Sequence, residues 1–314
     1  MYISEQEVRS VLTYEALIPA IRQALIEFSA GRVNQPPRMI LRAGNADDHR
    51  NGWFAVMPVV AQDFMGVKTV TWYPGNDELG LHTHMAIVEL LSRTTGEPLA
   101  VMDGRLITEM RTAAVSAVAF STLAPLHYDA LPTSFGILGS GVQARAHIQA
   151  FKKVWPEMDR ICVWSRNPAN AQRLADEVGA VAGSLEEASS ADVVLTATSA
   201  QVPVLRGQLL KQNALVFAVG ATGANIREID DEAMLSSYIV AESRSCVERE
   251  SGDVLLSGAK VHADLGEILA GQGVKEIPRN CRIISKSVGM AIEDVTAAQL
   301  VWRARQDAPI RHKE

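Results

Sequence analysis

An apolar run that leads into a glycine-rich turn and then into an amphipathic segment constrains the fold of this chain more than any other feature. Residues 134–138 are typical of a buried strand, and residues 142–154 have the spacing of an amphipathic helix. The turn between them contains Gly139, Ser140, Gly141, Val142, Gln143 and Ala144. A Gly-x-Gly-x-x-Gly turn between a strand and a helix is the fingerprint of a dinucleotide-binding fold.

The small residues of this turn each have a physical role in such a site. Gly139 permits the tight turn, Gly141 lets the backbone approach a pyrophosphate, and Ala144 replaces the third glycine but still allows close helix–strand packing. The helix start offers free N–H groups and a positive dipole end to the phosphates. The alternative is a glycine turn that binds no ligand. The strands and helices that follow favour the dinucleotide site over this alternative. We therefore expect cofactor contacts from Gly139, Ser140, Gly141, Val142 and Gln143.

The chain beyond this motif continues with strands and helices in alternation. The expected strands cover residues 134–138, 161–164, 192–196, 215–219, 238–240 and 283–287, and the expected helices cover residues 142–154, 169–178 and 291–305. Alternation at this interval indicates a parallel sheet with helices on both faces.

The first third of the chain has a different rhythm. A helix is expected over residues 13–30, with Thr13 as its N-cap and Gly31 as its stop. A meander of strands then covers residues 38–42, 53–59, 66–72, 85–91 and 99–103, and a helix rich in small residues covers 105–124. The expected fold class is therefore α/β, with a Rossmann-type doubly wound parallel sheet and a second α+β domain.

The end of the second expected parallel strand indicates which dinucleotide is bound. An NAD site usually has Asp or Glu there, because a carboxylate accepts hydrogen bonds from the ribose hydroxyls. Here the turn is Ser165, Arg166 and Asn167, without a carboxylate. A hydroxyl and a guanidinium suit a 2′-phosphate, although Arg166 as a solvated loop residue is an alternative. We expect these three residues to contact NADP(H) in preference to NAD(H), which remains possible.

Charged and titratable residues in the first region stand out from their apolar neighbours. Lys68 lies inside an expected strand, Arg111 lies in the small-residue helix, and Arg38 follows two prolines. A Lys in an apolar strand should either reach solvent or meet an anion, and three converging cations would bind a carboxylate. Spacing alone leaves a purely structural role open for each. His82 and His84 are equivalent candidates for acid–base chemistry, and without carboxylate or Cys companions they do not predict a metal site.

Bulk composition excludes other classes of function. The net charge is −6, from 30 Lys and Arg against 36 Asp and Glu, so we expect no binding to nucleic acid or to anionic membranes. The N-terminus lacks the pattern of a secretory signal, and no segment predicts a membrane-spanning helix. The 3 Cys residues are scattered, which suits a reduced, cytoplasmic setting better than a disulfide framework.

Five motifs in order along the chain resemble those of the ornithine cyclodeaminase/mu-crystallin family. They cover residues 100–104, 111–116, 139–147, 250–254 and 286–294. The resemblance implies a substrate-binding and dimerisation domain over residues 1–122 and 292–314, and an NAD(P)-binding Rossmann domain over 123–291. It also implies a homodimer, with the active site in the cleft between the domains.

The same resemblance assigns site residues. The family's carboxylate-binding positions fall on Arg38, Lys68 and Arg111, and its histidine falls on His84. Cofactor positions fall on Thr112, on Thr196, Ala197, Thr198 and Val219 along the strand ends, and on Ser287 and Val288 near the nicotinamide.

One departure from the family pattern bears on the reaction. Cyclodeaminases of the family have an Asp shortly after the glycine that follows the expected strand at residues 215–219, where this chain has Thr222. A hydroxyl cannot neutralise the side-chain ammonium of ornithine, so the resemblance is closest to the mu-crystallin-like ketimine reductase branch. We expect an NAD(P)H-dependent reductase of small cyclic 2-imino carboxylates, with Thr222 near the substrate and Lys68, His84 or a water as the proton donor. Ornithine cyclodeamination, alanine-dehydrogenase-like chemistry and a non-catalytic, cofactor-gated ligand-binding protein remain alternatives.

Overall fold

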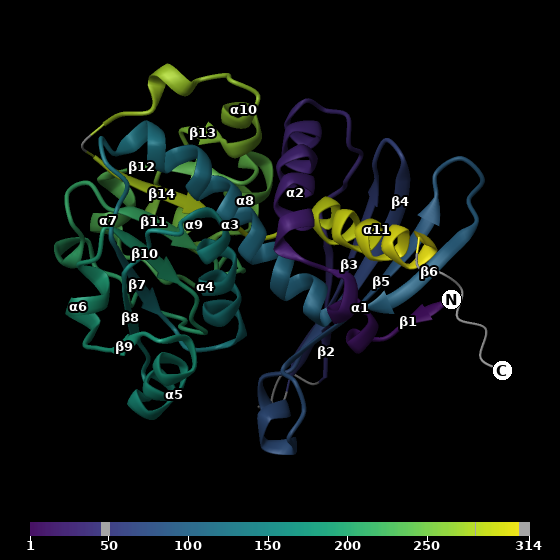
Figure 1. The fold of residues 1–314 in the computed structure, drawn as a ribbon, viewed down its shortest axis with the longest axis horizontal. Helices are drawn as coiled ribbons and strands as arrows, with labels where there is room; N and C mark the ends of the chain where they lie inside the picture. The colour runs from purple at the N-terminus through teal and green to yellow at the C-terminus, as the bar shows by residue number, and fades with distance from the viewer. Residues whose placement is uncertain (45–50, 280, 308–314) are drawn as a thin grey trace. The chain divides into compact units, whose positions relative to one another are not determined.

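Helix α3 (Arg105–His127) carries the chain from one structural unit into the other. The computed structural model describes residues 1–44, 51–279 and 281–307 (Figure 1). One unit comprises Met1–Arg111 and the segment that starts at Met290, and the other comprises Thr112–Gly289. The expected domains differ from these units mainly within α3, which is divided after Arg111 instead of after residue 122. Residues 45–50, 280 and 308–314, which fall within the expected domains, lie outside the described residues.

The first unit contains a six-stranded sheet in the order β1-β6-β5-β4-β3-β2. Its strands are β1 (Tyr2–Ile3), β2 (Met39–Ala43), β3 (Gly52–Val60), β4 (Phe64–Trp72), β5 (His84–Ser92) and β6 (Pro98–Asp103). Strands β2 to β6 form the predicted antiparallel meander, whereas β1 pairs in parallel with β6. The sequence did not predict β1, because two residues are too few to show a period.

Three α-helices, besides the start of α3, belong to this unit: α1 (Glu5–Val11), α2 (Tyr14–Ser29) and α11 (Ala291–Asp307). The predicted cap of α2 is confirmed, because the Thr13 hydroxyl accepts from the N–H of Ala16. The predicted stop is confirmed as well, because Gly31 has a φ of 71° just beyond the helix end. Helix α11 lies against α2 and against the strands β3, β4 and β5 (Figure 1).

The two faces of the six-stranded sheet differ in exposure. Lys68 pairs in register with Met57 and Val88, and all three side chains are buried on the face that α11 covers. On the opposite face, Met85 is 39% exposed and Ile87 is 47% exposed. This face therefore presents apolar side chains that no helix of the described residues buries.

The second unit contains an eight-stranded sheet whose strands are all parallel, as predicted, although two of the strands, with two residues each, were not expected. Its strands are β7 (Ser134–Leu138), β8 (Arg160–Trp164), β9 (Val181–Ala182), β10 (Val193–Thr196), β11 (Leu215–Ala218), β12 (Ser237–Ala241), β13 (Ala263–Asp264) and β14 (Arg282–Lys286). Its helices, after α3, are α4 (Val142–Val154), α5 (Pro168–Val178), α6 (Leu185–Ser189), α7 (Asp231–Leu235), α8 (Arg244–Glu250), α9 (Gly252–Ser257) and α10 (Leu265–Leu269).

The strand order β13-β12-β14-β11-β10-β7-β8-β9 reverses direction at β7. The chain moves from β7 to β8 and β9 on one side, then returns to β10 on the other side. Such a reversal leaves a crevice at the carboxyl ends of the two central strands, where doubly wound folds bind their ligands. The α/β, Rossmann-type prediction is confirmed, and the glycine turn follows β7 at this point.

Candidate functional site

The glycine turn has the geometry that a pyrophosphate requires. Gly139 has a φ of 120°, and a Cβ there would overlap the carbonyl of Ala197, so a larger residue would be strained. A Cβ on Gly141 would meet nothing within 4 Å, and Gly141 is the N-cap of α4 without a side-chain capping bond. Because helix starts carry N–H groups without intrahelical partners, this end of α4 fits an anion. Ala144 is fully buried, as its packing role predicts.

The turn after β8 lies beside the glycine turn. The Ser140 hydroxyl donates to the Ser165 hydroxyl over 3.0 Å, which ties the two turns together. Arg166 and Asn167 are exposed, and Asn167 caps α5 by accepting from the N–H of Ala169. The structure thus brings the residues predicted to select the cofactor next to those predicted to bind its pyrophosphate.

A buried histidine of α4 links the glycine turn to helix α3. The Nδ1 atom of His147 lies 2.7 Å from the carbonyl of Gln143, which can only accept, so Nδ1 carries the proton. The Nε2 atom lies 3.0 Å from the Ser116 hydroxyl and accepts from it. Burial lowers the pKa of His147 to about 4, which keeps the ring neutral and preserves this pair of bonds. The sequence predicted no site role for His147, although His147 is the last residue of the third family motif.

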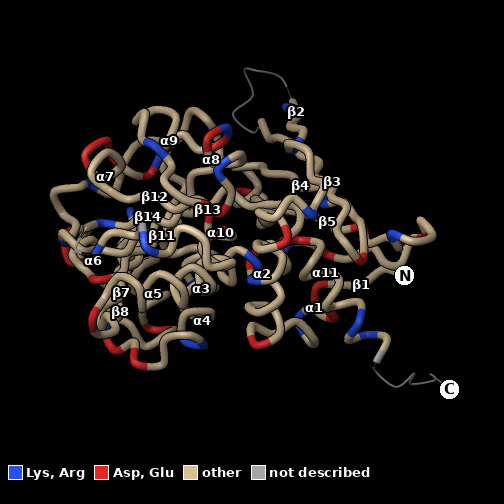
Figure 2. Tube along the Cα trace, turned by 90° about the horizontal axis from the view of Figure 1, so that it is seen from above, with Lys and Arg blue, Asp and Glu red and all other residues tan. Residues whose placement is uncertain are grey.

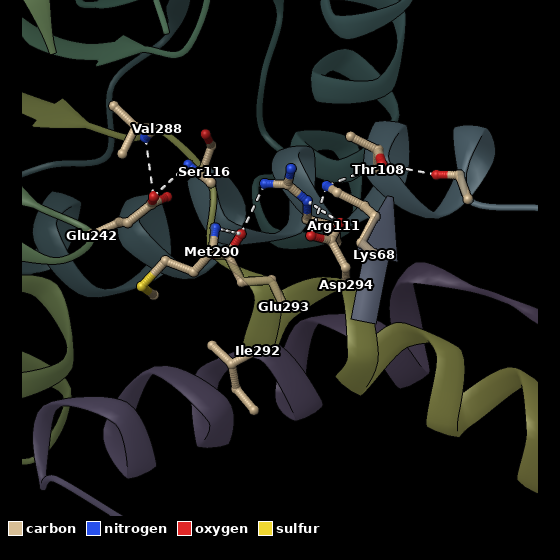
Figure 3. A network of polar contacts seen from close by, with 12 residues as sticks. Lys68, Thr108, Arg111, Ser116, Glu242, Val288, Met290, Ile292, Glu293 and Asp294 are labelled. Atoms are coloured by element: carbon tan, nitrogen blue, oxygen red, sulfur yellow. Dashed lines mark hydrogen bonds and ion pairs between the residues drawn. The ribbon is translucent and has the colours of Figure 1, made fainter. Parts of the chain in front are cut away.

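In the first unit, Lys68 of β4 and Arg111 of α3 point toward one carboxylate, Asp294 of α11 (Figure 3). The Nζ atom of Lys68 lies 2.7 Å from Oδ2 of Asp294, and Nε of Arg111 donates to Oδ1 over 2.9 Å. Lys68 is 2% exposed and Asp294 is fully buried. A lysine in an apolar strand was expected to reach solvent or to meet an anion. In this structure Asp294 of the chain itself is that anion.

A second carboxylate from the same helix completes the cluster. Glu293 is fully buried, and its Oε2 atom accepts from Nη1 of Arg111 over 2.8 Å and from the N–H of Met290 over 3.1 Å. The Thr108 hydroxyl lies 3.5 Å from Nζ of Lys68. Sequence interpretation assigned roles to the two cations but not to the two acids, which lie in the last family motif.

The pKa values in this cluster follow from burial and from neighbouring charges. Burial would raise the pKa of Asp294, but Arg111 and Lys68 outweigh it and hold that pKa below its ordinary value. Burial lowers the pKa of Lys68 to about 8, while Asp294 opposes this change and Arg111 and Arg38 reinforce it. A lysine with a pKa near neutrality can both hold and release a proton under ordinary conditions.

The remaining predicted residues of this unit have unequal positions. Burial, followed by Lys68 and Arg111, lowers the pKa of His84 to about 4, so its ring is neutral near pH 7. Arg38 is half-buried and lies close enough to Lys68 to lower its pKa. His82 is exposed, and its carbonyl accepts from the Asn76 side chain. Lys68, Arg111, His84 and Arg38 are thus brought together, whereas the bond from Asn76 involves the backbone of His82 and not its ring.

The strand-end positions surround a buried carboxylate that we did not predict. Thr196 is fully buried at the end of β10, and its hydroxyl donates to Oε2 of Glu228 over 2.9 Å. The N–H of Thr198 donates to Oε1 of Glu228 over 2.7 Å. Ala197 and Val219 are half-buried beside them, and the N–H groups of both continue the ladder, to Leu138 and Thr196 respectively.

The turn after β14 is held in the same way. Oε1 of Glu242 accepts from the N–H groups of Val288, over 3.0 Å, and of Gly289. Ser287 and Val288 are buried. Thr222 is half-buried in the loop that follows β11, and Thr112 is buried in α3. The loops that follow β10, β11 and β14 therefore carry the remaining predicted cofactor and substrate positions, except that Thr196 ends β10 and Thr112 lies in α3.

The described residues contain neither a metal-ligand cluster nor a membrane-spanning helix. Within residues 1–44, 51–279 and 281–307, no three or more His, Cys, Asp or Glu side chains group as metal ligands would. In the same ranges, no helix has the length and hydropathy needed to cross a membrane. Lys and Arg are interspersed with Asp and Glu along both units (Figure 2).

Nearly the whole chain matches the model of a known protein family. The model of the ornithine cyclodeaminase/mu-crystallin family matches residues 1–308. The chain belongs to this family. It is 40% identical to ketimine reductase mu-crystallin of Mus musculus in an alignment 313 residues long that covers 96% of this chain and 96% of that protein. The resemblance deduced from the five motifs is therefore confirmed.

Solved structures of relatives have the same fold. A Thermococcus litoralis Δ1-pyrroline-2-carboxylate reductase, in complex with NADH and L-proline, is 31% identical with a TM-score of 0.87, covering 98% of this chain and 97% of that one. An archaeal alanine dehydrogenase dimer with bound NAD is 27% identical with a TM-score of 0.88, covering 98% and 96%. Both structures contain a nicotinamide dinucleotide without the 2′-phosphate.

Proposed function

We propose that this chain is an NAD(P)H-dependent reductase of small cyclic 2-imino carboxylates, of the Δ1-pyrroline-2-carboxylate or Δ1-piperideine-2-carboxylate type. The observation that carries this proposal is the pair of buried cations, Lys68 and Arg111, that a single carboxylate holds side by side. The similarity to a ketimine reductase and to a Δ1-pyrroline-2-carboxylate reductase supports it.

The charges of the cluster suit an anionic substrate. Three cations, Lys68, Arg111 and Arg38, lie near two carboxylates, Asp294 and Glu293, which leaves one positive charge in excess among these five groups. A guanidinium has five N–H donors and an ammonium has three, so both can bind the acidic pair and a substrate carboxylate together. The acidic pair fixes the cations before substrate arrives, and positioning of this kind accounts for much of the rate gain in enzymes.

Lys68 is the group that we assign as the proton donor. An iminium accepts hydride far more readily than a neutral imine, so an acid must supply or maintain a proton at the ring nitrogen. Lys68, with its pKa of about 8, is mostly protonated at pH 7, whereas His84, with its pKa of about 4, is not. Lys68 would therefore hold the proton at the imine nitrogen while Arg111 orients the carboxylate.

The second unit would hold the cofactor. The N–H groups at the start of α4 would bind the pyrophosphate, and Ser165 and Arg166 would bind the adenosine end. When bound, the reduced nicotinamide supplies the hydride that adds to the imine carbon. The absence of a carboxylate at residues 165–167 supports NADP(H) in preference to NAD(H), because a guanidinium pairs well with a 2′-phosphate.

Thr222 weighs against cyclodeamination of ornithine. Its hydroxyl lies in the loop after β11, where the cyclodeaminases have a carboxylate, and a hydroxyl cannot balance the charge of a distal ammonium. A cyclic imino acid lacks that ammonium, so the same position suits it better.

A spectrophotometric assay tests the proposal. Oxidation of NADPH and NADH is followed with the pyrroline and piperideine 2-carboxylates, beside an assay for ammonia release from ornithine and one for NADH formation from alanine. Substrate-dependent oxidation with a cyclic imine is the expected result. Ammonia release without net oxidation would identify a cyclodeaminase, and no turnover of any substrate would favour a ligand-binding protein.

The uncovered face of the six-stranded sheet is the surface that we assign to a homodimer contact. Met85 and Ile87 are exposed on this face, and exposed apolar patches of sheets mark contact surfaces. A relative with 27% identity is described as a dimer, which supports this assignment. Light scattering on protein eluted from a size-exclusion column measures the molar mass, and we expect the mass of two chains.

A further inference from the structure

Glu228 is a fully buried carboxylate that accepts four hydrogen bonds in the second unit. Its Oε2 atom accepts from the N–H groups of Gly220, over 2.8 Å, and Ala221, over 3.1 Å, and from the Thr196 hydroxyl. Its Oε1 atom accepts from the N–H of Thr198 over 2.7 Å. The carboxylate thus joins the loop after β10 to the loop after β11.

Two further buried charges complete the arrangement around Glu228. Nζ of Lys286, the last residue of β14, lies 2.8 Å from Oδ2 of Asp253 and donates to the carbonyl of Ala221 over 3.0 Å. Oδ1 of Asp253 accepts from the N–H groups of Glu228, over 2.8 Å, and Ile229, over 3.0 Å. Lys286 and Asp253 are fully buried as well.

These contacts bind both the N–H groups and a carbonyl of the turn that leads to Thr222. Glu228 binds the N–H groups of Gly220 and Ala221, and Lys286 binds the Ala221 carbonyl. A Cβ on Gly220 would overlap Oε1 of Glu228 and lie 2.5 Å from the carbonyl of Thr198, so the packing around the carboxylate leaves no space. A turn held this closely keeps its geometry without help from a ligand.

The number of donors explains why the group is a carboxylate. Burial raises the pKa of Glu228, but Lys286 and the N–H of Thr198 oppose this, and an ionised carboxylate accepts at both oxygens. An amide offers one oxygen and one NH₂. In either orientation, the NH₂ of Gln at position 228 would face an N–H donor, either that of Thr198 or those of Gly220 and Ala221.

The loops that Glu228 joins lie at the carboxyl ends of β10 and β11, beyond the strand that carries the glycine turn. In a doubly wound fold the dinucleotide crosses this edge of the sheet, with its pyrophosphate at the glycine turn. We propose that Glu228, braced by Lys286 and Asp253, is a positioning residue for the nicotinamide half of the cofactor. This proposal rests on the dinucleotide site of the proposed function but not on its substrate.

Glu228→Gln tests the proposal by binding alone, without turnover. Calorimetric titration compares NADPH with adenosine 2′,5′-bisphosphate, and NADH with ADP, so that each dinucleotide is measured beside a fragment that lacks nicotinamide. We expect dinucleotide affinity to fall about tenfold and fragment affinity to stay within about twofold, because the dinucleotide must then order the loop itself, at a cost of about one charge-assisted hydrogen bond.

Asp192→Asn is the matched control. Asp192 accepts from the N–H groups of Thr133 and Ser134, over 3.2 Å each, but it lies before β10, at the opposite ends of the strands. Its replacement should lower the melting temperature without changing the ratio of dinucleotide to fragment affinity. A purely structural role of Glu228 would give the same behaviour as Asp192→Asn.

Thr196→Val keeps the proposal testable if Glu228→Gln does not fold. It removes only the hydroxyl that donates to Oε2 of Glu228, and it should weaken dinucleotide binding in the same direction by a smaller factor. Equal weakening of dinucleotide and fragment, or no change in either, would overturn the proposal. A wild-type protein that binds neither dinucleotide would overturn it too, whereas failure of every imine substrate would leave it standing.

Discussion

Asp294→Asn should move the pH dependence of imine reduction to lower pH. Asp294 lies 2.7 Å from Nζ of Lys68, and its charge raises the pKa of Lys68 against burial and against Arg111 and Arg38. The variant keeps the size of the side chain but removes the charge. Lys68 must be protonated to act as the acid, so activity is present below its pKa and is lost as pH rises through that pKa.

The size of the shift follows from the contact. The pKa of Lys68 is about 8 with Asp294 ionised. An opposite charge at this range changes a pKa by about 1 to 3 units, so the variant should have a Lys68 pKa of roughly 5 to 7. At pH 7 the protonated fraction would fall from about 0.9 to between about 0.5 and 0.01, and kcat/KM would fall by a similar factor.

The assay is the kcat/KM profile for one cyclic imine between pH 5 and pH 9, in the wild type and in two variants. The protonation of the substrate is common to all three, so it cancels in the comparison. Glu293→Gln is the control, because Glu293 binds Arg111 and the N–H of Met290, whereas Asp294 is the carboxylate that lies 2.7 Å from Nζ of Lys68. A falling limb that stays in place in Asp294→Asn, or that moves equally in Glu293→Gln, would refute the assignment of Lys68 as the acid.

Three other changes test separate parts of the proposal. Arg166→Ala should weaken NADPH about tenfold and leave NADH unchanged in a fluorescence titration, since only the 2′-phosphate loses a charged partner; equal weakening would contradict the NADP preference. Lys68→Met should lower kcat/KM at least about a hundredfold, the usual contribution of a general acid, and full activity would exclude that role. Ile87→Asp should convert the proposed dimer to a monomer in light scattering, because it puts a charge on the uncovered apolar face. A dimer of unchanged mass would place the dimer contact elsewhere.

The sequence predicted the elements that have strong local signals. The bounds of β7 and α4 agree with the expected strand and helix because the glycine turn between them punctuates the chain at both ends. Helices were expected between several of the later strands, but the bounds of α6 to α10 were not predicted. Each has only five to seven residues, fewer than two turns, so no helical period shows. Their burial depends on the parallel sheet beneath them.

The candidate site was only half visible in the sequence. Lys68 and Arg111 stood out because cations are rare among apolar neighbours. Asp294 and Glu293 did not, because acids at the start of a helix are common where the dipole favours them. The contact between Arg111 and Asp294 spans 183 residues, and only the folded chain shows it.

A lysine inside an apolar strand is therefore a stronger prediction of a partner carboxylate elsewhere in the chain than of a ligand. Lys68 in β4 has Asp294, and Lys286 in β14 has Asp253, each at hydrogen-bonding distance and fully or almost fully buried. Removing either carboxylate would take away the buried lysine's partner at hydrogen-bonding distance, which is far more destabilising than the loss of a surface pair. The two lysines differ in their surroundings. The carboxylates near Lys286 accept mostly from backbone N–H groups, and Glu228 also accepts from the Thr196 hydroxyl, which suits a fixed scaffold. Lys68 instead has two arginines nearby and a lowered pKa, which suits an anionic substrate and a moving proton.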